Sequence, residues 1–143
     1  MSTMVLLVDD EVPFVETMTK RLNKRNLSIL NAFSGTEALE VLEKESNVDV
    51  VILDVKMPGM DGIDTLREIK RVHPLVEVIM LTGHGTIESG IEGMKLGAFD
   101  YLTKPCNIDQ LMTKVQEAKD LKSMREDKIR QARIAEIALR RGD

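Results

Sequence analysis

The residues best suited to chemistry in this 143-residue chain are carboxylates that directly follow short apolar runs. Asp9 and Asp10 follow the run 4–8, and Asp54 follows the run 48–53. If these runs are neighbouring parallel strands, their carboxyl ends meet at one edge of a sheet and the three acids share a pocket. Oxygen ligands of this kind suit a hard cation such as Mg²⁺. The pattern therefore predicts a magnesium site whose carboxylates repel one another while no metal is bound.

Two more polar residues follow later apolar runs. Thr82 follows the run 77–81, and Lys104 lies just beyond a short run at 101–102. A hydroxyl and an ammonium on the opposite rim of the pocket suit a phosphoryl group bonded to one carboxylate. In that chemistry the carboxylate is the nucleophile, and the metal and the lysine offset the growing negative charge. Each residue alone is more simply explained as a turn or surface residue, but polar residues at the ends of four strands favour a site.

The elements that must position these residues alternate along the chain. Between the apolar runs, apolar residues recur at helical spacing, as in Val15, Met18 and Leu22. Strands that alternate with helices predict a parallel sheet covered on both faces. An eight-stranded barrel needs a longer chain. We therefore expect an α/β fold with an open, doubly wound sheet of five strands, formed by the runs 4–8, 28–32, 48–53, 77–81 and 101–102.

Capping residues mark several helix ends. Ser34 and Asn107 are expected to begin the second and the last helix, and Gly97 is expected to end the fourth. The fourth helix also contains Gly90 and Gly93, each of which costs about 0.8–1 kcal/mol relative to alanine in a helix interior. Either these glycines allow close packing against a neighbour, or they keep the helix easy to move.

Composition and charge exclude several classes of protein. A chain with 43% hydrophobic residues is not intrinsically disordered, and 3% aromatic residues provide no stacking platform for single-stranded nucleic acid. One cysteine excludes an internal disulfide. Residues 122–143 carry a net charge of +3 and the rest −7, so the acidic body is not expected to bind nucleic acid directly. No apolar run approaches the roughly 20 residues of a membrane span, and we expect a cytoplasmic protein without membrane contact.

The sequence resembles the receiver domain of two-component response regulators over about residues 4–121. The resemblance is carried by VDDE at 8–11, ILDVKMPGMDG at 52–62, LTGHG at 81–85 and GAFDYLTKP at 97–105. It implies a flavodoxin-like (βα)5 fold in which the first and third strands are adjacent. It also implies the roles of the site residues.

For the acidic residues, the resemblance implies that Asp54 is the phosphoacceptor, forming a 4-aspartylphosphate. It implies that Mg²⁺ is the cofactor, bound directly by Asp10 and mainly through water by Asp9. Asp54 and the backbone carbonyl of Lys56 would be further ligands.

On the opposite rim, the resemblance implies that Thr82 and Lys104 bind the phosphoryl oxygens and that the peptide bond between Lys104 and Pro105 is cis. Tyr101 matches the switch aromatic, which turns inward when Thr82 moves toward the phosphate. The simpler interpretation of Tyr101 is a ring at the edge of the core with its hydroxyl in water. His84 would flank the route by which water reaches the phosphate.

The implied function is a phosphorylation switch. A sensor histidine kinase or a phosphotransfer protein donates the phosphoryl group, and a downstream output protein or domain responds. Such a protein is not an enzyme in the usual sense, because it catalyses only its own phosphorylation and dephosphorylation. Two alternatives stay open: a receiver-like scaffold that works without phosphorylation, and a Mg²⁺-dependent phosphatase with an Asp nucleophile. The phosphatase chemistry requires a second acid at the position that Lys56 occupies, and a cap domain that encloses the substrate. Both requirements count against this alternative.

The last part of the chain is expected to differ from the rest. We assign residues 1–121 to the receiver domain and 122–143 to a charged helical tail, without a separate effector domain. Glu126 with Arg130 and Glu136 with Arg140 have the favoured i,i+4 order of a solvated helix. A homodimer through the face of the fourth and fifth helices, or through the tail, is a further possibility.

Overall fold

The structure of the protein, a computed structural model, describes residues 2–57, 59–83 and 87–142. Five strands alternate with five helices in these residues, and the predicted order of elements is confirmed. The strands are β1 (Thr3–Val8), β2 (Leu27–Ala32), β3 (Val50–Leu53), β4 (Glu77–Thr82) and β5 (Asp100–Thr103). The helices are α1 (Val12–Asn23), α2 (Gly35–Lys44), α3 (Gly62–Val72), α4 (Ile87–Lys95) and α5 (Ile108–Arg140).

All the strand pairs are parallel, and the strand order is β2-β1-β3-β4-β5. β1 is therefore the neighbour of β3, and Val8 at the end of β1 pairs with Leu53 at the end of β3. The chain order reverses between these two strands, which is the place where open α/β sheets bind ligands. The residues that follow β1 and β3 consequently start from adjacent positions.

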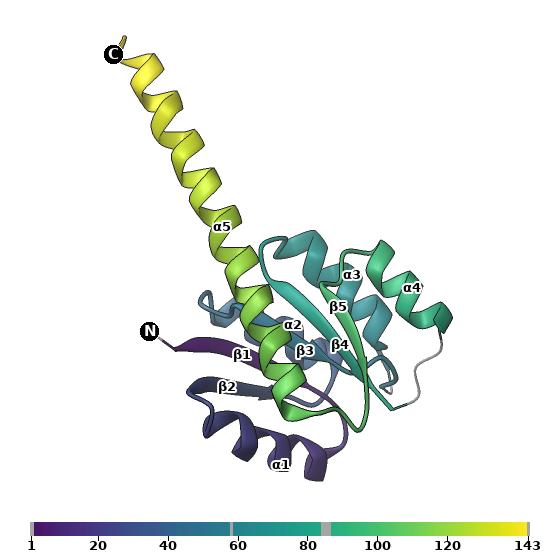
Figure 1. Cartoon of the computed structure of the whole chain (residues 1–143). Coiled ribbons are helices and arrows are strands. Elements are labelled where there is room, and N and C mark those ends of the chain that lie inside the picture. The colour runs from purple at the N-terminus through teal and green to yellow at the C-terminus, as the bar shows by residue number, and fades with distance from the viewer. Residues whose placement is uncertain (1, 58, 84–86, 143) are drawn as a thin grey trace.

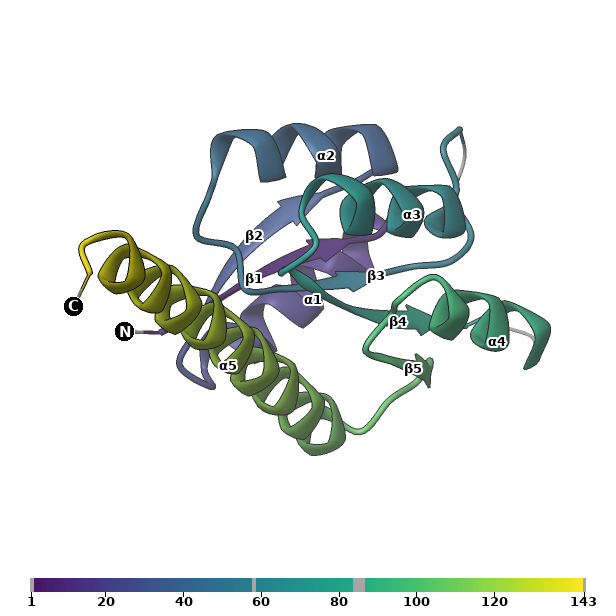
Figure 2. The ribbon, with the colours of Figure 1, turned by 90° about the horizontal axis from the view of Figure 1, so that it is seen from above.

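Alternate residues along each strand enter two separate cores. Leu6 and Val8 of β1 belong to the core beneath α2 and α3, whereas Val5 and Leu7 belong to the core beneath α1 and α5. Figure 2 shows α2 and α3 on one side of the sheet and α1 and α5 on the other. Because β1, β3 and β4 are covered on both sides, their sequences are nearly continuous apolar runs.

The predicted caps are present. The Ser34 hydroxyl accepts a hydrogen bond from the Glu37 backbone N–H at 3.1 Å, and the Asn107 side chain accepts from the N–H groups of Asp109 and Gln110. Gly97 has a φ of 102°, the left-handed conformation that ends α4. Gly93 lies directly over Met80 of β4, so close packing explains the glycine.

The last helix continues well past the sheet. α5 runs for 33 residues without a break, about 50 Å at 1.5 Å per residue, and Figure 1 shows its second half projecting away from the body. The expected helical extension is confirmed. Although α5 is long, neither it nor any other helix of the described ranges is apolar enough to cross a membrane.

Candidate functional site

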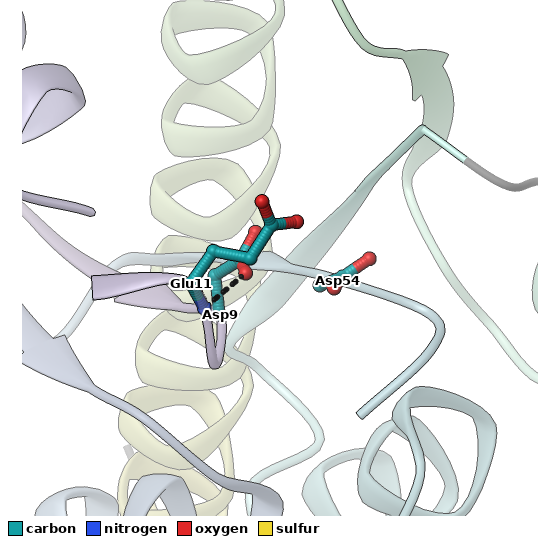
Figure 3. A group of neighbouring side chains, drawn as sticks. All are labelled: Asp9, Glu11 and Asp54. Atoms are coloured by element: carbon teal, nitrogen blue, oxygen red, sulfur yellow. Dashed lines mark hydrogen bonds between the residues drawn. The ribbon is translucent and has the colours of Figure 1, made fainter. Parts of the chain in front are cut away.

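Three carboxylates meet at the carboxyl edge of the sheet. Carboxylate oxygens of Asp9, Glu11 and Asp54 all lie within 4.8 Å of one another, and Figure 3 shows the three side chains facing a common space. The backbone fixes this arrangement, because the Asp54 N–H donates to the Val8 carbonyl at 3.0 Å, next to Asp9. The structure thus brings Asp9 and Asp54 together, as the adjacency of β1 and β3 requires.

The third member of the cluster differs from the sequence expectation. Asp10 is exposed and lies outside the group of three, and Glu11 contributes the third carboxylate. The Glu11 backbone N–H donates to Asp9 Oδ1 at 2.9 Å, which holds the turn between β1 and α1. Residues 9–11 form a bend after β1 and not a strand, so the alternation of strand side chains gave no signal for Glu11.

Lys104 lies against the same cluster. Its Nζ is 2.6 Å from Asp9 Oδ2 and 3.4 Å from Glu11 Oε1, and it lies 4.0 Å from the centre of the Phe14 ring. The Lys104 backbone N–H donates to the Thr82 carbonyl at 2.8 Å, which ties the loop after β5 to the end of β4. The peptide bond to Pro105 is cis, as the resemblance implied.

The charges of the cluster change the pKa values of its members. Burial and the nearby charge of Asp9 raise the pKa of Asp54, although Lys104 and a hydrogen bond from the Lys56 backbone N–H partly oppose them. Burial alone would lower the pKa of Lys104, but its hydrogen bond and ion pair with Asp9, with further help from Asp54, raise it. The pocket therefore has more negative charge than Lys104 alone can balance, which is the condition that favours a bound cation.

Thr82 ends β4 at the same edge of the sheet. Its side chain is fully buried, and its position pairs with Thr103 of β5. Because Leu53 pairs with Met80, Thr82 lies slightly farther along the sheet edge than Asp54. Thr82 therefore lies on the β4 side of the pocket, across β3 from Asp9.

Tyr101 lies farther from the carboxylates, between β5 and α4. A Cβ built on Gly90 would be 3.4 Å from the Tyr101 ring, so α4 covers the ring at van der Waals distance. The Tyr101 hydroxyl is buried, and it has no hydrogen-bond partner among the described residues. Its burial raises the pKa of the phenol. The simpler interpretation, a hydroxyl in water, is therefore wrong, because this oxygen is buried.

The loop after β3 is held close to Asp54 by a glycine. The Gly62 N–H donates to the Val55 carbonyl at 2.8 Å, and a Cβ on Gly62 would lie 2.2 Å from the Asp54 carbonyl oxygen. Only glycine lets α3 begin this near to the strand end. The Lys56 side chain is exposed in the same loop. His84 lies outside the residues that the structure describes.

The comparisons with known proteins agree with this geometry. The family model of the response regulator receiver domain matches residues 5–116. The transcriptional regulatory protein ZraR of Escherichia coli is 37% identical over 114 residues, which cover 80% of this chain and 26% of ZraR. The NtrX-like response regulator of Rickettsia bellii is 37% identical over 127 residues, which cover 87% of this chain and 26% of that protein. The chain thus spans about a quarter of the length of these curated relatives.

A solved structure gives the same result for the fold. A response regulator receiver domain protein from Clostridium thermocellum superposes with a TM-score of 0.82 at 38% identity, over 85% of this chain and 98% of the other. The predicted doubly wound, flavodoxin-like fold is confirmed. Neither the phosphatase nor the scaffold alternative finds support in these comparisons.

Proposed function

This chain belongs to the family of response regulator receiver domains, and on that premise we propose that Asp54 is its phosphoacceptor. The observation that carries the proposal is the convergence of Asp54, Asp9 and Glu11 at the sheet edge with Lys104 hydrogen-bonded among them. Asp54 is the member of this cluster that follows the central strand β3, and it has a raised pKa. Burial leaves its carboxylate poorly solvated, so a positive partner or a bond to phosphorus relieves it.

The donor set fits a magnesium ion. Three carboxylates within 4.8 Å supply oxygen ligands and excess negative charge, which suits a small hard cation. We propose that Asp54, Asp9 through water and the backbone carbonyl of Lys56 hold Mg²⁺, with Glu11 close enough to bind or orient water. Asp10, which lies outside the cluster of three, would turn toward the ion to bind it directly. When bound, the ion neutralises charge on the attacking carboxylate and on the transferred group.

Asp54, Lys104 and Thr82 have different roles in the proposed phosphoryl transfer. An Asp54 carboxylate oxygen attacks phosphorus, and the bond from phosphorus to the donor atom breaks with its electron pair leaving on the donor. Lys104 binds a phosphoryl oxygen and exchanges part of its contact with Asp9 for that purpose. Thr82 donates its hydroxyl proton to another phosphoryl oxygen. Movement of Thr82 toward the phosphate opens space near β5, into which the Tyr101 ring can shift.

The partners follow from this chemistry. We propose that a sensor histidine kinase or a phosphotransfer protein supplies the phosphoryl group, and that an output protein or domain responds to the changed surface. The relatives ZraR and NtrX-like are named as a transcriptional regulator and a response regulator, which supports a signalling role. We propose that the protein has this role in the cytoplasm. In this role the chain catalyses only its own phosphorylation and dephosphorylation.

A homodimer is the second part of the partner proposal. α4 exposes Ile87, Ile91 and Met94, and the projecting half of α5 exposes Ile134 and Ile137. Large apolar side chains exposed together favour contact with another protein surface.

The test is phosphorylation by a small acyl phosphate with Mg²⁺, followed by intact-protein mass. The wild type should gain the mass of one phosphoryl group, and Asp54→Asn should gain none. Asp64→Asn, in the exposed first turn of α3, is the matched control and should behave as the wild type does. Phosphoryl gain by Asp54→Asn equal to that of the wild type would reject Asp54 as the acceptor.

A further inference from the structure

Two buried carboxylates lie at the edge of the sheet opposite Asp54. Asp49 comes immediately before β3 and Glu77 is the first residue of β4; their residues are 6% and 2% exposed. An unpaired buried charge is strongly destabilising, so the groups that face these two acids must be accounted for. Most of them come from one helix, α5.

Asp49 is bound from two directions. Its Oδ2 accepts the Met4 backbone N–H at 3.0 Å, and its Oδ1 accepts Lys119 Nζ at 3.0 Å and Lys122 Nζ at 3.2 Å. Lys122 is itself buried, and it also reaches Glu126 at 3.2 Å. Asp49 is thus a junction between β1, β3 and α5.

Glu77 makes the corresponding contact one strand away. Its Oε1 accepts a hydrogen bond from Nη1 of Arg125 at 2.8 Å, and Nζ of Lys70, in α3, is 3.7 Å from the same oxygen. Lys70 also donates to the carbonyls of Pro74 and Val76, so it is held by the loop before β4. Arg125 remains half-exposed.

The cations on α5 follow directly after its last apolar contacts. The buried apolar residues of α5 are Leu111, Val115 and Ala118. Lys119, Lys122 and Arg125 then recur every three residues, which places them on one side of the helix. Past Ala118, the one buried residue among those described in α5 is Lys122, whose ammonium contacts Asp49.

The same two strands connect these contacts to the proposed phosphorylation site. β3 begins next to Asp49 and ends next to Asp54, and β4 begins with Glu77 and ends with Thr82. Both strands are buried along their full length, so they transmit displacement as rigid elements.

We propose that Asp49 and Glu77 are positioning residues that clamp α5 to β3 and β4. The clamp orders the helix beyond Ala118 and makes its direction follow the strands that carry Asp54 and Thr82. The ordering of α5 by the clamp is independent of phosphorylation. The coupling of its direction to Asp54 and Thr82 rests on the proposed function. Beyond the clamp, α5 extends into solvent with exposed Ile134 and Ile137, so its direction decides where an output partner meets the domain.

The test of the clamp is hydrogen exchange of the segment 122–133 in the unphosphorylated, full-length protein. Asp49→Asn combined with Glu77→Gln keeps both shapes and removes both charges. Exchange in this segment should become at least about tenfold faster, because a helix of this length without tertiary contacts is marginal in water. The matched control is Asp127→Asn with Glu136→Gln, which removes two charges from the exposed pairs with Arg130 and Arg140. It should stay within about twofold of the wild type in this segment. Equal exchange in the clamp variant and the wild type would overturn the clamp.

A milder variant keeps the test decisive if the double variant unfolds. Arg125→Gln removes a half-exposed cation and leaves Glu77 beside Lys70, so the sheet is expected to stay intact. It should speed exchange at 126–133 several-fold and leave the strands β3 and β4 protected. Unchanged exchange at 126–133 in this folded variant would also overturn the proposal.

A measurement on the phosphorylated protein tests the coupling separately from the clamp. In the wild type, treatment with acyl phosphate and Mg²⁺ should change exchange at 122–133, and in the clamp variant that change should disappear while Asp54 is still phosphorylated. If the wild type is phosphorylated and the segment does not respond, the coupling is wrong and the function stands. If Asp54 is not phosphorylated in either protein but the clamp variant loses protection at 122–133, the function is wrong and the clamp stands.

Discussion

Asp54 is a buried carboxylate in a cluster that has too little positive charge nearby. Burial and Asp9 raise its pKa, and Lys104 is held mainly by Asp9 at 2.6 Å. The folded state therefore binds a proton at Asp54 more tightly than the unfolded chain does. The resulting stability is present at low pH and is lost as the pH rises from the ordinary value of 3.8 through the raised pKa. At neutral pH the Asp54 charge opposes folding unless a cation is bound.

The first prediction is that Asp54→Asn raises the free energy of unfolding at neutral pH without metal, by about 1 kcal/mol, because it removes this charge. Mg²⁺ should stabilise the wild type by about 2.7 kcal/mol at a hundredfold excess over its Kd, and the variant by much less. Denaturant unfolding in chelator and in Mg²⁺ measures both effects. Identical curves for the wild type in the two conditions would contradict the metal site.

Among individual residues, the sequence predicted those at the strand ends, but not all of the side chains that lie next to them. Asp9, Asp54, Thr82 and Lys104 could be found because each ends or directly follows an apolar strand, and the resemblance supplied the strand order that brings these ends together. Glu11 was missed because its side chain returns to the pocket through a turn whose shape is not evident from residue types. The burial of the Tyr101 hydroxyl was likewise missed, since it depends on tertiary packing around the ring, for which residue types along the chain give no local signal.

Among the elements, α4 owes its position to two glycines with different surroundings. A Cβ on Gly93 would lie 2.2 Å from Sδ of Met80, whose side chain is fully buried. A Cβ on Gly90 would meet the Tyr101 ring at 3.4 Å, an ordinary van der Waals distance. Of the two explanations for these glycines, close packing therefore applies to Gly93.

The second prediction compares these glycines. Gly93→Ala should lower the free energy of unfolding by about 1–3 kcal/mol, because the fully buried Met80 side chain must change conformation within the core to admit the Cβ. Gly90→Ala should raise it by up to about 1 kcal/mol through helix propensity. Denaturant midpoints at constant m-value measure both changes. A stabilised Gly93→Ala would show that α4 can shift outward at little cost.

The third prediction concerns Asp49, which connects β1, β3 and α5. Burial alone would raise the pKa of Asp49, but the Met4 N–H, Lys119 and Lys122 bring it below the ordinary value of 3.8. The stability that this ionised group contributes is therefore complete above pH 3.8 and is lost as the pH falls through the lowered pKa. Asp49→Asn should cost about 1–3 kcal/mol at neutral pH. The difference between variant and wild type should shrink below pH 3.8, as measured by unfolding at a series of pH values. A difference that is constant down to pH 2 would contradict the ionic role.

In the whole molecule, α5 has two different parts. Its first part packs against the sheet, and its second part projects into solvent. The sequence predicted the order of elements and the extension of α5, because periodicity and capping residues are local signals. It did not predict that Lys119, Lys122 and Arg125 contact Asp49 and Glu77, because residues so far apart in the chain show no shared spacing. We keep the division into residues 1–121 and 122–143 as a prediction about function, while these contacts continue to Arg125.

The fourth prediction compares two truncations. Removal of 127–143 keeps the contacts of Lys122 and Arg125, so it should leave stability and Asp54 phosphorylation intact and weaken any self-association made through Ile134 and Ile137. Removal of 122–143 also strips Lys122 from Asp49 and Arg125 from Glu77, so it should lower the free energy of unfolding by about 3 kcal/mol. Sedimentation velocity and unfolding curves measure the two effects. Equal monomeric mass for the full chain and the shorter forms would contradict dimerisation through the tail.

The proposal that Asp54 is the phosphoacceptor is tested most directly by identifying the residue that carries the phosphoryl group. After reaction with an acyl phosphate and Mg²⁺, borohydride reduction converts an aspartyl phosphate to homoserine, and peptide sequencing by mass spectrometry locates it. We expect homoserine at position 54, and none when Mg²⁺ is chelated. Homoserine at position 9 or 10, or a phosphoryl group stable to borohydride on another residue type, would contradict it.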